Sequence, residues 1–301
     1  MTPSQPRIAV LLSTYNGESF VTAQIESVLA QDMDNVTLYV RDDGSSDGTL
    51  DILRDYEHKG QLVLFAESNR GVVPSFIELI TRTADDFDYV ALCDQDDIWY
   101  PNKLSRAISV LATRDQSIPQ LYCAEYRYCD KDMVPGERSH LNRIGVYFDT
   151  MLYENMVSGN TCVLNQRLAQ TVAAAGVDGV YCHDWWIALV ATSLGELSFD
   201  DFLCLDYRRT GSNASPAGTS GVSLLRYRIR TFFVDRQLDK VTNQLQRLYD
   251  LYADSLSKEH RALLERFLRG NRFKKALTPV RLRQMLRDEV ALRLLFLIHL
   301  L

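Results

Sequence analysis

The chain has 301 residues, of which 46% are hydrophobic and 24% are charged. These proportions are those of a folded globular protein, and the length suffices for one large domain or two moderate ones. The N-terminal residues form no apolar run, so no secretory signal is visible. The six cysteines are scattered without a Cys-x-x-Cys pair, which argues against zinc and predicts reduced, buried thiols in a cytosolic protein.

The net charge of −6 conceals an asymmetry along the chain. From Ser220 onward there are 17 Lys and Arg against 8 Asp and Glu, a balance of +9. The remainder holds 16 against 31, a balance of −15. The sign changes just after a loop-like stretch at residues 210–218, so we predict a first domain over residues 1–218 and a basic helical region over residues 219–301.

Strands and helices are predicted to alternate along the first 200 residues. Apolar runs predict strands over residues 8–12, 36–40, 62–65 and 89–93, and apolar residues at helical spacing predict helices over residues 20–29, 50–56 and 74–81. This alternation predicts an α/β fold, with a mostly parallel sheet covered by helices on both faces.

Polar segments follow these strands at residues 13–17, 42–48, 69–71 and 94–97. Ligands of such sheets bind outside the carboxyl ends of the strands, so we expect the four segments to converge on one site. Gly-x-Gly-x-x-Gly and Gly-x-x-x-x-Gly-Lys-Ser/Thr are both absent, which argues against the usual dinucleotide fold and a P-loop enzyme. Carboxylates and hydroxyls instead suit base and ribose recognition by side chains, with a metal neutralising a diphosphate.

Three carboxylates, Asp94, Asp96 and Asp97, crowd into four positions after the predicted strand 89–93. Like charges this close raise one another's pKa unless a cation lies between them. Mg²⁺ is such a cation, because it commonly bridges carboxylates to substrate phosphates. The alternative is a solvated turn in which one Asp caps the helix starting near Pro101.

Two residues of the earlier loops have candidate roles in base recognition. Asp43 has a carboxylate that could accept a pyrimidine N3–H, and Tyr15 has a ring that could stack on the base or lie at its edge. Asp43 could equally close an Asx-turn, and Tyr15 could serve packing alone. Their joint placement at the strand ends favours the functional interpretation.

Three motifs together resemble the family 2 glycosyltransferases with the GT-A fold: VLLSTYNG (10–17), RDDGSSDGT (41–49) and DQDD (94–97). The resemblance continues in SGNT (158–161), HDWW (183–186) and YRRTGSN (207–213), and it covers about two-thirds of the chain in the family's order. The CDQDDxW and HDWW versions are most similar to bacterial rhamnosyltransferases of polysaccharide and O-antigen assembly.

The resemblance implies how the donor is bound. Ser13, Tyr15 and Asp43 would hold the nucleobase. Arg70 would lie near the ribose and phosphates, and Asp94 would face the ribose side.

The resemblance also implies the chemistry. Asp96 would contact Mg²⁺ or Mn²⁺ bridging the diphosphate, with Asp97 supporting or sharing the ion. Asp184 would be the general base of an inverting transfer, in which the acceptor oxygen attacks the anomeric carbon as the diphosphate leaves from the opposite face. Asp184 could also cap the helix that follows it. Trp185 and Trp186 are candidates for acceptor binding, although large aromatics are more often core residues, and we expect one to point outward and one inward.

The sequence departs from the family pattern at Thr210, where relatives often carry a His that completes the metal shell. Either the ion is then held more weakly or water fills the gap. Arg208 or Arg209 could bind the diphosphate, since guanidinium groups suit phosphate geometry, or could be surface residues.

The C-terminal region is predicted to be helical, with an apolar stripe made of Val234, Leu238, Val241, Leu245, Leu248 and Tyr252. The stripe could pack on the first domain or form a homodimer. Basic residues over 269–287 precede an apolar stretch at 290–301 that is too short to span a bilayer. This pattern suits docking on an anionic membrane surface, or else a buried last helix with a basic rim. The acidic first domain and the lack of a recognition motif argue against nucleic acid as a partner.

The resemblance therefore implies a cytoplasmic enzyme, peripheral at the inner membrane face. It would transfer L-rhamnose from dTDP-L-rhamnose to a glycan or lipid-linked acceptor in surface polysaccharide synthesis. Two alternatives stay open, which are a transferase using another donor such as a UDP-hexose, and a non-catalytic module that binds nucleotide sugars or glycans.

Overall fold

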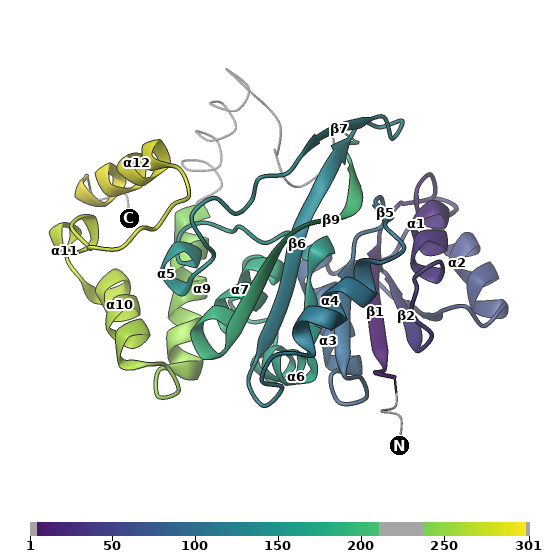
Figure 1. The fold of residues 1–301 in the computed structure, drawn as a ribbon, viewed down its shortest axis with the longest axis horizontal. Helices are drawn as coiled ribbons and strands as arrows, with labels where there is room; N and C mark the ends of the chain where they lie inside the picture. Colours follow the sequence, from purple (N-terminus) through teal and green to yellow (C-terminus); the bar gives the residue numbers. More distant parts are fainter. Residues whose placement is uncertain (1–4, 211–236, 299–301) are drawn as a thin grey trace.

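A mixed β-sheet forms the centre of the computed structural model, which describes residues 5–210 and 237–298 (Figure 1). Its strands are β1 (Ile8–Thr14), β2 (Val36–Asp42), β3 (Val63–Ala66), β4 (Tyr89–Cys93), β5 (Ile98–Trp99), β6 (Gln120–Cys129), β7 (Pro135–Arg138), β8 (Val163–Asn165) and β9 (Glu196–Arg208). Across the described part of the sheet they lie in the order β3-β2-β1-β4-β8-β6-β9-β5, with β7 paired to β6.

The sheet has a parallel half and a mixed half. β1 is parallel to β2 and β4, and β2 is parallel to β3. β8 runs antiparallel to both β4 and β6, whereas β6 and β9 are parallel. The predicted α/β fold is confirmed, because each of the four strands expected from the apolar runs is present in the parallel half.

Helices cover both faces of the sheet (Figure 1). In the described residues they are α1 (Val21–Leu29), α2 (Thr49–His58), α3 (Val72–Thr83), α4 (Lys103–Leu111), α5 (Phe148–Met151), the short 3₁₀ helix η1 (Gly159–Thr161), α6 (Gln166–Ala175), α7 (His183–Leu194), α9 (Gln237–Tyr252), α10 (Lys258–Arg269), α11 (Arg272–Ala276) and α12 (Leu286–Leu297).

The side chains of β1 contribute to a hydrophobic core on each face of the sheet. Ile8, Val10 and Leu12 pack into a core shared with α1, α2 and α4. Ala9 and Leu11 point to the other face, into a core shared with α3, α6 and α7. A central strand that is apolar on both faces is typical of a parallel sheet covered on both sides.

The C-terminal helices lie at one end of the molecule beside α5 and α7 (Figure 1). On α9, Val241, Leu245 and Leu248 are buried in the same core as α7. These members of the predicted stripe therefore pack on the first part of the chain. Val234, the side chain of Leu238 and the predicted boundary between residues 218 and 219 lie outside the described residues.

Two further observations concern the chain as a whole. All six cysteines are free thiols, and all but the half-buried Cys182 are fully buried. Over residues 5–210 and 237–298, no helix combines the length and apolar character needed to cross a bilayer.

Candidate active site

The loops after β1, β2 and β4 meet at the carboxyl edge of the sheet. After β1 the chain moves outward through β2 to β3, and β4 then lies on the other side of β1. Such a switch point leaves a crevice outside the strand ends, where open α/β sheets bind ligands. Contact between the first two loops is direct, because the Asn16 N–H donates to the Ser45 hydroxyl at 2.9 Å.

Gln95 joins the β1 loop to the acidic loop after β4. Its Oε1 accepts from the Tyr15 N–H at 2.9 Å, and its Nε2 donates to the Tyr15 carbonyl at 3.1 Å. A Cβ at Gly17 would collide with the Gln95 amide, so a larger residue there would displace the Gln95 side chain. Gln95 was not among the residues predicted from the sequence.

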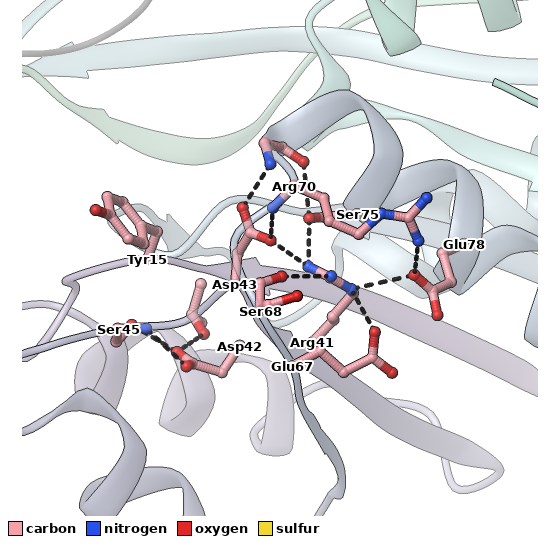
Figure 2. Close-up of polar contacts among 12 residues, drawn as sticks. Tyr15, Arg41, Asp42, Asp43, Ser45, Glu67, Ser68, Arg70, Ser75 and Glu78 are labelled. Atoms are coloured by element: carbon pink, nitrogen blue, oxygen red, sulfur yellow. Dashed lines mark hydrogen bonds and ion pairs between the residues drawn. The ribbon is translucent and has the colours of Figure 1, made fainter. Parts of the chain in front are cut away.

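Asp43 lies in a buried cluster at the end of β2 (Figure 2). The carboxylate is 3% exposed and accepts from the Arg41 guanidinium and from the N–H groups of Arg70 at 2.7 Å and Gly71 at 2.8 Å. Burial acts to raise the pKa of Asp43, but these donors outweigh it and hold the pKa below its usual value. Asp43 therefore stays ionised while fastening β2 to the start of α3.

The neighbouring Asp42 ties this loop to the end of β1. Its carboxylate accepts from the Thr14 hydroxyl at 2.9 Å and from the N–H of Ser45 at 2.9 Å. The carboxylate of Asp43 accepts from Arg41, Arg70 and Gly71 and not from an N–H two residues on, so it serves the Arg41 cluster and not the Asx-turn considered for it.

The other residues predicted to bind the donor lie around this cluster. Tyr15 is 50% exposed and stands to one side of it in Figure 2. Ser13 is half-buried at the end of β1. The Arg70 side chain is largely exposed, and its Nη1 lies 3.3 Å from Glu78 Oε2 on α3.

The acidic loop holds two half-buried carboxylates and one buried carboxylate. Asp94 and Asp96 are half-buried, whereas Asp97 is 1% exposed. Burial, followed by the charges of Asp96 and Asp184, raises the pKa of Asp94 to about 7. Burial also raises the pKa of Asp96, against the opposing charge of Arg208. The negative charges of Asp96 and Asp184 thus repel that of Asp94, and a bound cation would relieve this repulsion.

Asp97 is held from within the protein. Its carboxylate accepts from the Asn160 side chain and from the Arg208 N–H at 3.3 Å. Burial and the charges of its two acidic neighbours raise its pKa well above the usual value. Asp97 is therefore placed to support the loop, and Asp94 and Asp96 are more accessible to a ligand.

A buried lysine lies beneath the loop. Lys103 is 0% exposed, its Nζ donates to the Asn160 carbonyl at 2.5 Å, and the ammonium lies 3.0 Å from the Trp99 ring centroid. Burial lowers the pKa of this amine to about 8. Lys103 was not predicted from the sequence, although it shares one helical face with Ala107 and Leu111, both of which are buried.

Asp184 lies in the first turn of α7 and faces the acidic loop closely enough to raise the pKa of Asp94. Its carboxylate accepts from the Asn155 side chain at 3.0 Å, the Gly159 N–H at 3.1 Å and the Cys182 thiol at 2.9 Å. It also accepts from the N–H of Trp185 at 2.6 Å. Asp184 thus satisfies one amide of the helix terminus, but three donors outside α7 also hold it at the site.

The expectation that Trp185 or Trp186 points outward is wrong. Trp185 is 5% exposed and its indole N–H donates to the Met151 carbonyl at 2.6 Å, while Trp186 is 0% exposed. Both rings belong to the core that α7 shares with α5 and α9. Because the C-terminal helices cover this side of α7, neither ring is available for stacking on an acceptor sugar.

The structure separates the two candidate arginines after β9. Arg208 lies at the site, where its Nε donates to the Asp96 carbonyl at 3.0 Å. The Arg209 guanidinium instead lies 3.7 Å from the ring centroid of Tyr128. Thr210 stands where relatives often carry a His, and it is the last described residue before position 237.

The donor set fits a cation that keeps part of its water shell. Within the described residues, no group of three or more His, Cys, Asp and Glu side chains is arranged to hold a metal ion, so the protein would supply at most one or two carboxylates. Mg²⁺ usually binds through one or two carboxylates plus substrate phosphates and retains several waters. The half-buried Asp94 and Asp96, with raised pKa values, suit such an ion.

Solved structures of similar fold include glycosyltransferases. TarS of S. aureus in complex with UDP-GlcNAc superposes with a TM-score of 0.54 at 16% identity, covering 97% of this chain and 92% of that chain. The mannosyltransferase PcManGT from Pyrobaculum calidifontis, in complex with GDP-Man and Mn²⁺, gives a TM-score of 0.51 at 15% identity and covers 98% and 87%. At these identities the likeness establishes the fold alone, and the predicted GT-A architecture is confirmed.

Sequence relatives agree with the fold. The dTDP-rhamnosyl transferase RfbG of Shigella flexneri is 31% identical over 105 residues, which span 33% of this chain and only 36% of RfbG. TuaG of Bacillus subtilis, a glycosyltransferase named for teichuronic acid biosynthesis, is 31% identical over 243 residues, or 80% of this chain and 92% of TuaG. The family model for glycosyl transferase family 2 matches residues 9–168. With the loops of that segment converging at one sheet edge, the chain belongs to glycosyl transferase family 2.

Proposed function

We propose that this protein is an inverting, metal-dependent glycosyltransferase. It moves L-rhamnose from dTDP-L-rhamnose onto a glycan or lipid-linked acceptor in the synthesis of a bacterial surface polysaccharide. The observation that carries the proposal is the convergence of Asp43, the acidic loop and Asp184 at one edge of the sheet. The rhamnose donor is supported by the match to RfbG and by the CDQDDxW and HDWW motifs.

The nucleobase would lie against Asp43 and Tyr15. Asp43 accepts three hydrogen bonds from the protein, and a carboxylate offers about four lone-pair sites, so one acceptor site remains for a pyrimidine N3–H. The exposed Tyr15 ring could cover the base, with Ser13 beside it. Thymine and uracil both carry an N3–H, so these contacts fit dTDP and UDP donors alike.

The diphosphate would lie between the acidic loop and Arg208. Asp96, with Asp94 beside it, would hold Mg²⁺ or Mn²⁺, and Asp97 would support the loop through Asn160. When bound, the ion neutralises charge on the diphosphate and stabilises it as a leaving group. Arg208 adds a guanidinium next to Asp96, and Arg70 would lie toward the ribose and phosphates.

Asp184 would act as the general base. It would take the proton from the acceptor hydroxyl as that oxygen bonds to the anomeric carbon, and the bond from that carbon to the diphosphate oxygen would break on the opposite face. The products are the glycosylated acceptor and a nucleoside diphosphate. Asn155, Cys182 and the Gly159 N–H would orient the Asp184 carboxylate.

A lipid-linked acceptor would place the protein at the cytoplasmic face of the membrane as a peripheral protein. The basic charge of the C-terminal region, +9 from Ser220 onward, supports this location.

A donor panel tests the proposal. The purified protein would be given dTDP-L-rhamnose, UDP-glucose, UDP-galactose and UDP-GlcNAc in turn, with Mg²⁺ or Mn²⁺ and a lipid-linked acceptor, and release of nucleoside diphosphate would be measured. We expect release from dTDP-L-rhamnose alone. Release from a UDP-sugar instead would correct the donor, and binding without turnover across all acceptors would favour the non-catalytic module.

A further inference from the structure

Helix α12 exposes an apolar row on the side opposite to its packed face. Leu286, Val290, Leu294 and Ile298 follow one another at four-residue intervals and are 65%, 50%, 55% and 61% exposed. Residues four apart lie on the same side of a helix, so these side chains form one row, which we call the α12 row. A surface helix of a soluble protein normally carries polar residues on this side.

The other face of α12 is firmly anchored. Leu292 and Phe296 are buried, and the Phe296 ring lies 5.2 Å from that of Tyr153 and 5.7 Å from that of Phe267. Arg293 donates to the Ala276 and Thr278 carbonyls at 2.6 Å and 2.9 Å, which ties α12 to the end of α11. The α12 row is therefore presented by a fixed helix.

A second segment extends this apolar surface. Buried Gln284 accepts from the N–H groups of Arg143 at 2.7 Å and Ile144 at 2.9 Å, and it donates to the Gly145 carbonyl at 2.8 Å. The chain before α5 is thus bound to the residue that precedes Met285 and Leu286. Ile144 and Tyr147 in that segment are 41% and 62% exposed.

Exposed cations lie in the segments next to the α12 row. Arg143, Lys274 and Arg287 are all exposed in the segments that flank it, although Arg287 Nε lies 3.4 Å from Asp288 Oδ1. Arg281 and Arg293 are used differently, since Arg281 donates to the Arg283 carbonyl and Arg293 pairs with Glu289. Part of the basic charge of residues 269–287 thus holds the fold together, whereas Lys274 and Arg287 are exposed in the segments next to the α12 row.

We propose that the α12 row and its basic surroundings dock on the surface of an anionic lipid bilayer. The aliphatic side chains would enter the headgroup boundary, and the cations would meet lipid phosphates. A second copy of the chain is a poorer partner, because a two-fold interface would bring the same positive patch onto itself. In Figure 1 the start of β1 lies at the bottom and α12 lies near the top, so the docking helix lies toward the end of the molecule at which the parallel strands finish.

Docking on a bilayer is a property separate from the transfer reaction, although a bilayer as the partner rests on the lipid-linked acceptor of the proposed function. Flotation of the full chain tests it without any turnover. The vesicles would contain equal parts of phosphatidylglycerol and phosphatidylethanolamine, with phosphatidylcholine vesicles for comparison. The test variant is Val290→Ser/Leu294→Ser, and its matched control is Leu29→Ser/Val134→Ser, which removes exposed aliphatic side chains elsewhere.

We expect the wild type and the control to float with the anionic vesicles and to sediment with phosphatidylcholine. The α12 variant should lose partitioning by about 10-fold or more, and Lys274→Gln/Arg287→Gln should make binding weaker and less sensitive to salt. Floating without transfer activity would support docking and count against the proposed enzyme. Equal flotation of the wild type and the α12 variant would overturn the docking proposal. So would a dimer that the wild type and the control form without lipid and that the α12 variant does not form.

Discussion

The side chain of Gln95 makes a two-way hydrogen bond with the backbone of Tyr15, accepting at 2.9 Å and donating at 3.1 Å. It thereby fixes the loop after β1 against the loop after β4, across the switch point of the sheet. The residue proposed to cover the base and the carboxylates proposed to meet the diphosphate thus share one rigid connection.

Gln95→Leu should therefore weaken donor binding as well as lower stability. Each neutral hydrogen bond contributes about 0.5–1.5 kcal/mol net, so losing two, about 1–3 kcal/mol, should raise the donor KM by up to roughly 5- to 140-fold. Steady-state kinetics with varied donor would measure this change, with exposed Gln61→Leu as the control. An unchanged donor KM would show that the connection does not organise the site.

Asp184→Asn should lower kcat by about 10²- to 10⁴-fold, the usual contribution of a general base, while donor affinity stays the same. Asn155→Ala should give a smaller fall in kcat, because two of the three donors that hold Asp184 from outside α7 remain. Single-turnover transfer and a separate donor-binding titration would distinguish the effects. Full activity of the Asp184 variant would exclude it as the base.

Removal of divalent metal should abolish transfer, and added Mn²⁺ should restore it. Asp96→Asn should raise the Mn²⁺ concentration needed for half-maximal rate, since one charged ligand is lost. The exposed Asp86→Asn serves as a control for the change in net charge. Turnover that persists with excess chelator would contradict the metal role.

Lys103→Met should reduce both the stability of the fold and the affinity of the site for metal. The substitution leaves the Asn160 carbonyl without its buried donor and Asp97 without a nearby cation, and one unsatisfied buried group costs about 1–3 kcal/mol. We expect a lower free energy of unfolding in urea and a higher Mn²⁺ requirement. Lys103→Arg tests whether charge alone suffices, and a Lys103→Met protein as stable and metal-responsive as wild type would remove Lys103 from the site.

The stability contributed by Asp43 should depend on pH in a defined direction. Its folded-state pKa lies below the unfolded value of about 3.9, so the contribution is present above that value and is lost as the pH falls through the folded pKa. Wild type should exceed Asp43→Asn in unfolding free energy by about 1.5–3 kcal/mol at neutral pH, the range for a hydrogen bond to a charged group. Urea titrations between neutral and acidic pH should show the gap closing below about pH 4. A constant gap would indicate that ionisation of Asp43 does not matter to the fold.

Much of the site could be predicted because parallel strands bring their carboxyl ends to one edge of a sheet. The motifs of Tyr15, Asp43 and Asp96 lie directly after such strands, so local periodicity was enough to gather them. Gln95, Lys103 and Asn155 were missed because their partners lie far along the chain. Lys103, for example, donates to residue 160.

The tryptophans show a different kind of error. Trp185 and Trp186 were assigned to the acceptor from their position beside Asp184, but residues 185–191 are apolar without interruption. A helix that is hydrophobic all round is buried, so the composition of α7 by itself predicts that both tryptophans are buried.

The sequence alone determined the α/β alternation, the loops that carry the chemistry and the family, because these depend on local periodicity and contiguous motifs. Only the tertiary structure decided that Asp97 is enclosed by Asn160 while Asp94 and Asp96 stay half-exposed, and that Arg208 rather than Arg209 reaches the acidic loop. It also decided that α9 packs on the core while the α12 row faces outward. Those outcomes depend on contacts between distant segments, since burial and charge pairing are set by neighbours in space.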